Sequence, residues 1–124
     1  MSSSVLVEEN AQGRYQQRVC AGQHEWLSDE PESMGGSDAG PAPFDFLMAA
    51  LGSCTSITLR MYAERKQIDL TKISVELAHE KTEVDGVLRD HIQRRIHLEG
   101  NLSAEQRQRL LEIANKCPIF RTLS

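Results

Sequence analysis

The sequence of 124 residues predicts a single α+β domain over residues 1–124, with strands on both sides of one long central helix. Apolar and polar residues alternate in residues 5–28 and again in residues 73–98, which is the period of a strand. Between them, apolar side chains in residues 43–66 recur at three- and four-residue spacing, which is the period of a helix. Sets of strands separated by a helix are typical of the α+β class.

The first 28 residues are expected to form three short strands. Val5 and Val7 lie in the first strand, residues 15–21 form the second, and Gly22 separates it from a third strand at residues 24–28. The polar segment that follows, up to Pro43, contains three of the four prolines and three glycines, which predicts a loop inside the domain.

The central helix is expected to begin at Pro43 and to end near Lys66. Proline suits the first helical turn, because its missing N–H would have no partner there. The first two-thirds of this helix are almost uncharged, and a helix that is apolar on all sides is normally buried on all sides. A chain of this size offers too little cover, so the pattern predicts burial against a second copy of the chain.

Two further strands and a helix are expected after the central helix. Apolar residues alternate in residues 73–78 and 92–98, with Gly86 in the turn between them. Ser103 and Gln106 have the spacing of a capping box, which predicts a helix start. This last helix is expected to carry Cys117 at its end and to stop at Pro118.

Composition and charge exclude several classes of function. A net charge of −4 argues against a nucleic-acid partner, which would require a basic face. Residues 44–51 form the longest apolar stretch, too short to span a membrane, and the N-terminus lacks the features of a signal peptide. A cytoplasmic location is therefore expected, where thiols normally stay reduced. The histidines and cysteines have no zinc-site spacing, so no metal is expected.

Two of the three cysteines are the strongest candidates for chemistry. Cys54 lies in the middle of the central helix, beside the small polar residues Ser53, Thr55 and Ser56, and Cys117 lies at the expected end of the last helix. A cysteine in an apolar helix is most often a small core residue, so core packing stays open beside the roles of nucleophile and resolving thiol.

A reactive thiol must be ionised, and a free cysteine with a pKa of about 8.5 is only a few per cent thiolate at neutral pH. A nearby arginine supplies a permanent positive charge, and Arg14 and Arg18 of the second strand are the candidates. Asp45, near the start of the helix, is the candidate carboxylate for orienting that arginine. Each of the three is also consistent with a solvated surface charge, and Cys20 is interpreted as incidental.

Two segments resemble those of a known superfamily. Residues 35–63 read GGSDAGPAPFDFLMAALGSCTSITLRMYA, and residues 113–123 read IANKCPIFRTL. Both segments, and the order of the expected elements over essentially the whole chain, resemble the OsmC/Ohr superfamily of osmotically inducible protein C and organic hydroperoxide resistance proteins.

The resemblance implies an intertwined homodimer with active sites at the subunit interface and thiol-dependent reduction of organic hydroperoxides. Cys54 would attack the peroxide bond and become a sulfenic acid, and Cys117 would resolve it as a disulfide. A dithiol reductant, such as a protein-bound lipoyl group, would then reduce the disulfide without a metal, flavin or haem. The family's activating arginine lies near the start of the second strand, which favours Arg14 over Arg18.

Two features depart from the family pattern. Phe44 follows the first proline of the helix where better-characterised relatives carry a glutamate, and the first acid is Asp45, one position later. Relatives also continue beyond the position of Ser124 into a final strand, so either this sequence is truncated or that edge strand is missing. The alternative function is that of a redox-sensing or small-molecule-binding protein of the same fold without significant peroxidase turnover.

Overall fold

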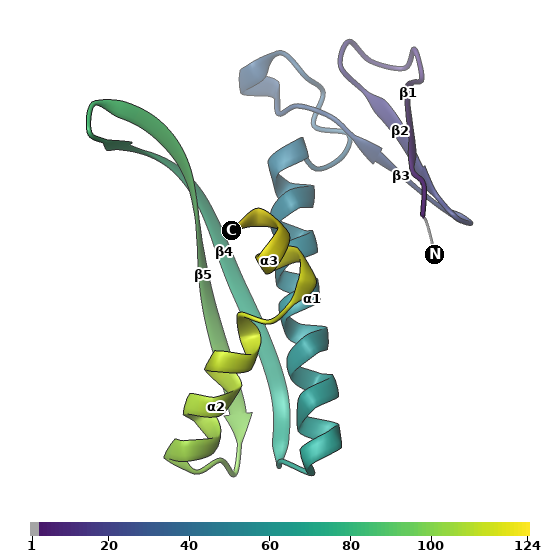
Figure 1. Cartoon of the computed structure of the whole chain (residues 1–124). Coiled ribbons are helices and arrows are strands. Elements are labelled where there is room, and N and C mark those ends of the chain that lie inside the picture. The colour runs from purple at the N-terminus through teal and green to yellow at the C-terminus, as the bar shows by residue number, and fades with distance from the viewer. Residues whose placement is uncertain (1–2) are drawn as a thin grey trace. The chain divides into compact units, whose positions relative to one another are not determined.

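The computed structural model describes residues 3–124 (Figure 1). They form two compact units, residues 3–47 and 48–124, with the boundary inside the long helix. The elements in chain order are β1 (Leu6–Glu9), β2 (Gln17–Ala21), β3 (His24–Ser28), the 3-10 helix η1 (Glu32–Met34), α1 (Pro43–Lys66), β4 (Leu70–Val84), β5 (Val87–Gly100), α2 (Ala104–Ala114) and α3 (Pro118–Leu123). The predicted α+β class is confirmed.

The first unit contains an antiparallel sheet in the order β1-β2-β3. The polar loop that follows the sheet is ordered around the buried carboxylate of Asp29, which accepts backbone N–H groups of Glu30, Ser37 and Ala39 at 2.7–3.2 Å. Burial alone would raise the pKa of Asp29, but these three hydrogen bonds outweigh it and hold the pKa below its ordinary value. The loop thus lies inside a folded unit, as the sequence predicts.

Helix α1 begins at Pro43 and ends at Lys66, the two residues that the sequence predicts. The carboxylate of Asp45 accepts the backbone N–H of Ala42 at 3.0 Å, which satisfies one of the free N–H groups at the helix start. Gln67 follows the helix with a φ of 53°, so the chain leaves α1 through a left-handed residue.

Strands β4 and β5 form a long antiparallel hairpin in the second unit. Val84 pairs with Val87, and the two residues of the turn, Asp85 and Gly86, both have positive φ, at 53° and 78°. This is the geometry of a type I′ turn, for which Asp-Gly is a preferred sequence. Both strands extend well beyond the alternating segments at 73–78 and 92–98 because this tight turn continues the ladder to the tip.

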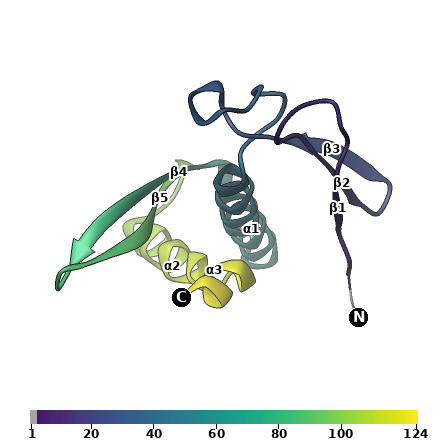
Figure 2. The ribbon, with the colours of Figure 1, turned by 90° about the horizontal axis from the view of Figure 1, so that it is seen from above.

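Helices α1 and α2 lie side by side against the hairpin, and α3 follows α2 (Figures 1 and 2). The buried core joins α1, β4 and α2 through Leu59, Ala63, Leu70, Leu110, Ile113 and Ala114. Close contact between helix and strand depends on Gly52, where an added Cβ would lie 2.7 Å from Cδ1 of Leu77. This packing fixes the middle of α1 against β4, and Cys54 lies in that stretch of α1.

The last helix of the sequence prediction is two helices in the structure. Ser103 and Gln106 form the predicted capping box, with both hydrogen bonds at 3.0 Å. However, α2 already ends at Ala114, and Cys117 caps the separate helix α3, which starts at Pro118. The prediction treated this proline only as a helix stop, whereas proline is also favoured at the first position of a helix.

Candidate functional site

The two candidate cysteines come together in the second unit. Cys54 lies on α1 and is half-buried, whereas Cys117 is fully buried between α2 and α3. The two thiols interact, since each shifts the pKa of the other, and the backbone N–H of Ile119 lowers the pKa of both. The geometry therefore permits an exchange of protons and of covalent bonds between the two sulfur atoms.

Cys117 is the N-cap residue of α3, so its sulfur faces backbone donors. It accepts the backbone N–H of Phe120 at 3.3 Å, and the hydroxyl of Thr55 lies 3.9 Å away. The Thr55 hydroxyl has one proton and also lies 2.8 Å from the carbonyl oxygen of Leu51, so its contact with the sulfur is the weaker one. A sulfur at a helix end with free N–H groups is in surroundings that favour a thiolate.

The surroundings shift the pKa values of the two thiols in opposite directions. Burial raises the pKa of Cys117, but the hydrogen bonds from Phe120, Cys54 and Thr55 outweigh it, so the pKa lies below its ordinary value. Burial also raises the pKa of Cys54, and the neighbouring Cys117 raises it further. In this unit the first proton to leave the pair comes from Cys117.

Arg94, which the sequence analysis did not single out, is the cation beside this pair. From β5 its guanidinium donates to Oγ1 of Thr55 at 2.9 Å, to the carbonyl oxygen of Ala114 at 3.1 Å and to Oδ1 of Asn115 at 2.5 Å. Its carbon Cζ also lies 4.4 Å from the ring centre of Phe120. The available signal was the alternation of β5, which places residue 94 on the same face as its apolar neighbours at 92, 96 and 98.

The other predicted site residues lie in the first unit. The guanidinium of Arg14 lies 4.8 Å from the ring centre of Tyr15, and the carboxylate of Asp45 caps α1. Among the described residues no ion pair joins Arg14 to Asp45. The structure therefore brings Cys54 and Cys117 together, but it shows no ion pair between Arg14 and Asp45.

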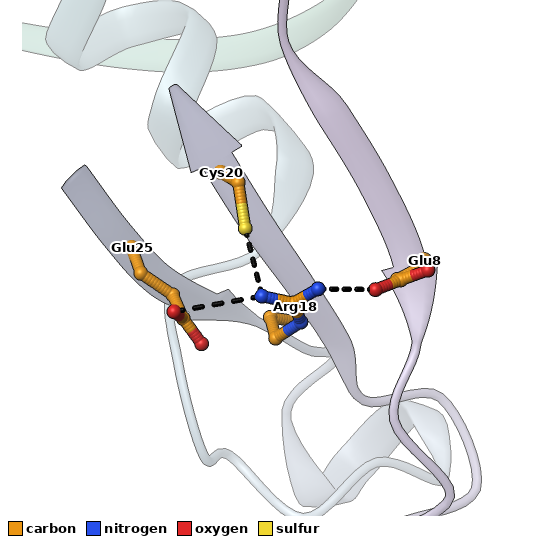
Figure 3. Close-up of polar contacts among 4 residues, drawn as sticks. All are labelled: Glu8, Arg18, Cys20 and Glu25. Atoms are coloured by element: carbon orange, nitrogen blue, oxygen red, sulfur yellow. Dashed lines mark hydrogen bonds and ion pairs between the residues drawn. The ribbon is translucent and has the colours of Figure 1, made fainter. Parts of the chain in front are cut away.

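Arg18 and Cys20 belong to a separate cluster in the first sheet (Figure 3). Arg18 forms ion pairs with Glu8 of β1 and Glu25 of β3, and its Nη1 donates to the sulfur of Cys20 at 3.0 Å. The hydrogen bond to Glu8, together with the charges of Cys20 and Glu25, raises the pKa of Arg18. The charge of Arg18 is thus balanced within its own sheet.

A shallow groove of about 420 Å³ opens beside Cys54. Its other lining residues are mostly small or apolar: Ala50, Ser53, Ile57, Thr58, Met61 and Pro118. The groove gives Cys54 a route to a small apolar molecule, whereas Cys117 is covered.

Neither a metal cluster nor a membrane span is found among residues 3–124. Their histidine, cysteine and acidic side chains form no group of three that could hold a metal ion. No described helix is long and apolar enough to cross a membrane.

The family model described as OsmC-like protein matches residues 35–124, which include both cysteine segments, α1 and the β4–β5 hairpin. The chain belongs to the OsmC-like protein family. No curated protein matches the chain.

Solved structures show the same fold at low sequence identity. An OsmC-like protein from Mycoplasma pneumoniae has a TM-score of 0.81 at 16% identity, covering 99% of this chain and 87% of its own. An organic hydroperoxide resistance protein OsmC from Legionella pneumophila has a TM-score of 0.75 at 16% identity, covering 99% and 89%. An organic hydroperoxide resistance protein from Elizabethkingia anophelis has a TM-score of 0.73 at 17% identity, covering 98% and 87%. At these identities the likeness establishes the fold of this OsmC-like chain.

Proposed function

We propose that this OsmC-like protein is a thiol-dependent peroxidase that reduces organic hydroperoxides in the cytoplasm. The Cys54 thiolate attacks the peroxide, the O–O bond breaks, and Cys54 becomes a sulfenic acid while the alkoxide takes a proton and leaves as an alcohol. Cys117 then attacks the Cys54 sulfur, and a disulfide forms with the loss of water.

The proximity of Cys54 to Cys117 is the observation that carries this proposal: each thiol shifts the pKa of the other, and Pro118, next to Cys117, lines the groove at Cys54. The groove beside Cys54 supports an apolar hydroperoxide as the substrate, since its lining is mostly apolar. The covered position of Cys117 supports the second role, because a resolving thiol has to reach only Cys54. The names of the Legionella and Elizabethkingia proteins agree with peroxide resistance as the wider theme.

The complete site is proposed to need a second copy of the chain and a reductant. Arg14 is the proposed cation for the Cys54 thiolate, with Asp45 as its carboxylate partner, as the family resemblance implies. In a homodimer each site would lie at the subunit interface. A dithiol of the lipoyl type would return the disulfide to two thiols by thiol–disulfide exchange.

The test is the intact mass of the reduced protein after one equivalent of cumene hydroperoxide, followed by excess dihydrolipoamide. The wild type is expected to lose two hydrogen atoms, with the disulfide mapped to Cys54 and Cys117, and to regain them with the dithiol while peroxide consumption continues. Cys54→Ser should abolish peroxide reduction. Cys117→Ser should permit one turnover and leave a sulfenic acid that dimedone traps, and Cys20→Ser is the control that should react like the wild type.

The outcomes also separate the alternative function. A reversible disulfide without continued peroxide consumption would replace the peroxidase with a redox sensor. Two unmodified thiols would contradict the proposed chemistry altogether and favour a small-molecule-binding protein that uses the groove. Full activity in Cys54→Ser would overturn the assignment of the nucleophile.

A further inference from the structure

Arg94 is a cation placed on the core-facing side of a strand, where the proposed function does not yet give it a role. Its neighbours on that side of β5, Ile92 and Ile96, are apolar and half-buried. Burial lowers the pKa of Arg94, which reflects the cost of removing a charged group from water. A partly buried guanidinium needs hydrogen bonds or opposite charges to offset the loss of water. The partners of Arg94 therefore indicate its role.

The contacts of Arg94 converge on the two segments that carry the sulfurs. Thr55 directly follows Cys54 on α1, so the hydrogen bond at 2.9 Å ties the arginine to the turn of α1 that carries the first sulfur. Ala114 and Asn115 end α2 and lead into Cys117, and they accept two further hydrogen bonds at 3.1 and 2.5 Å. One side chain therefore ties α1 to the segment that carries the second sulfur.

The charge of Arg94 is not neutralised by a carboxylate. Within residues 3–124 no acidic side chain forms an ion pair with it, and its hydrogen-bond acceptors are a hydroxyl, a carbonyl and an amide. The electrostatic interaction of Arg94 is instead with Cys117, whose negative charge favours the charged arginine. The same interaction stabilises the Cys117 thiolate.

We propose that Arg94 is a positioning residue for disulfide formation, holding Cys117 beside Cys54 and stabilising it as the thiolate that attacks the Cys54 sulfenic acid. This role rests on the proposed function, because it concerns its second step. The Cys117 thiolate forms a bond to the Cys54 sulfur, the S–OH bond of Cys54 breaks, and the hydroxide that leaves takes a proton to become water. The hydroperoxide supplies the only oxidant, in the preceding step.

The first test needs no peroxide. Thiolate absorbance near 240 nm is followed against pH in a variant with Cys20→Ser and Cys54→Ser, in which Cys117 is the only thiol. Adding Arg94→Gln should move the titration to higher pH by about one unit, which is about a tenfold loss of thiolate at neutral pH. Arg94→Lys keeps the charge and should restore part of the shift. Arg95→Gln is the matched control, because Arg95 is exposed on the opposite face of β5 and should leave the titration unchanged.

The second test follows the reaction with cumene hydroperoxide in the full-length protein that retains Cys54 and Cys117. Arg94→Gln should slow conversion of the sulfenic acid to the disulfide about tenfold at neutral pH, while formation of the sulfenic acid changes less than twofold. Raising the pH should recover the slowed step, because the Cys117 thiolate then forms without the arginine. A loss caused only by damaged packing would not recover with pH.

The outcomes distinguish this inference from the proposed function. An unchanged Cys117 titration in both Arg94 variants, together with an unchanged rate of disulfide formation, would overturn the role of Arg94. A wild type that does not react with peroxide would overturn the peroxidase, yet the titration without peroxide would still decide whether Arg94 stabilises the thiolate. If Arg94→Gln fails to fold, the Cys117 titration and the pH profile of disulfide formation are compared between Arg94→Lys and the wild type instead.

Discussion

At the scale of single residues, Cys54 and Cys117 differ in exposure and in the direction of their pKa shifts although they interact with each other. A lowered pKa at Cys117 contributes stability above the ordinary cysteine pKa, and this contribution is lost as the pH falls through the pKa of the folded protein. The raised pKa of Cys54 has the opposite effect, since its contribution is present below the ordinary pKa and is lost as the pH rises. As the pH rises, the half-buried Cys54 thus keeps its proton longer than the buried Cys117.

This coupling predicts the behaviour of Cys54 when its neighbour is removed. Cys117→Ser deletes the neighbouring thiolate, so Cys54 should ionise at a lower pH than it does beside Cys117. The measurement is the pH dependence of Cys54 alkylation by iodoacetamide, read by mass spectrometry in a Cys20→Ser background. A Cys54 profile that is the same with and without Cys117 would show that the two sulfurs do not interact.

The sequence singled out Cys54 and Cys117, which the structure brings together, but not the arginine near them. Cys54 and Cys117 could be selected because both stand in long segments that resemble those of the family. Arg94 was not selected in the same way: the alternation of β5 places it on the apolar face, but only the fold shows that this face brings it to Thr55 and Asn115. Arg18 shows the converse error of a charge-based choice, since its charge is balanced by Glu8 and Glu25.

At the scale of secondary structure, the capping box of α2 is a local device that the sequence predicts and the structure contains. Ser103→Ala removes the acceptor for the N–H of Gln106 and should lower the free energy of unfolding by about 1 kcal/mol. Urea denaturation measures this change, and Ser74→Ala on an exposed position of β4 is the control, expected within about 0.5 kcal/mol of the wild type. Equal losses in both variants would contradict a specific role for the cap.

Elements whose boundaries are set by unambiguous local signals were predicted better than those in which one residue is compatible with two structures. Helix α1 begins and ends where the proline, the spacing of apolar residues and the charged last turn indicate. The segment 113–123 was predicted less well because Pro118 can end one helix or begin another, and the choice depends on Cys117 serving as an N-cap. The two cases differ in the electrostatic environment of the Cys117 sulfur. At the C-terminus of a helix it would face carbonyl oxygens, whereas as the N-cap of α3 it faces free backbone N–H groups.

At the scale of the whole molecule, the exposed side of α1 supports the predicted homodimer. Ile57 and Met61 lie one turn apart on this helix, and their exposed fractions are 52% and 62%. Fully burying a side chain of this size contributes about 1.5–3 kcal/mol, and covering the exposed half of each contributes roughly half of that. Ile57 and Met61 also line the groove at Cys54, so the surface on which a second copy is proposed to pack includes one wall of that groove.

The dimer proposal predicts the effect of a charge on this stripe. Met61→Lys should shift the protein from dimer to monomer, because a lysine ammonium would lose its water inside an apolar interface. Sedimentation equilibrium measures the change, and Leu88→Lys is the control, since Leu88 is 68% exposed near the tip of the hairpin. A monomeric wild type, or equal dissociation constants for both variants, would contradict the proposed interface.

Cys117 is both a member of the sulfur pair and the N-cap of α3, so a change in the oxidation state of its sulfur also affects the stability of that helix. A helix of only six residues has few internal hydrogen bonds, so it depends on the bond between the Phe120 N–H and the Cys117 sulfur. Disulfide formation removes the negative charge from that sulfur and weakens it as an acceptor. In the proposed cycle, residues 118–123 would therefore be held less tightly in the oxidised protein than in the reduced one.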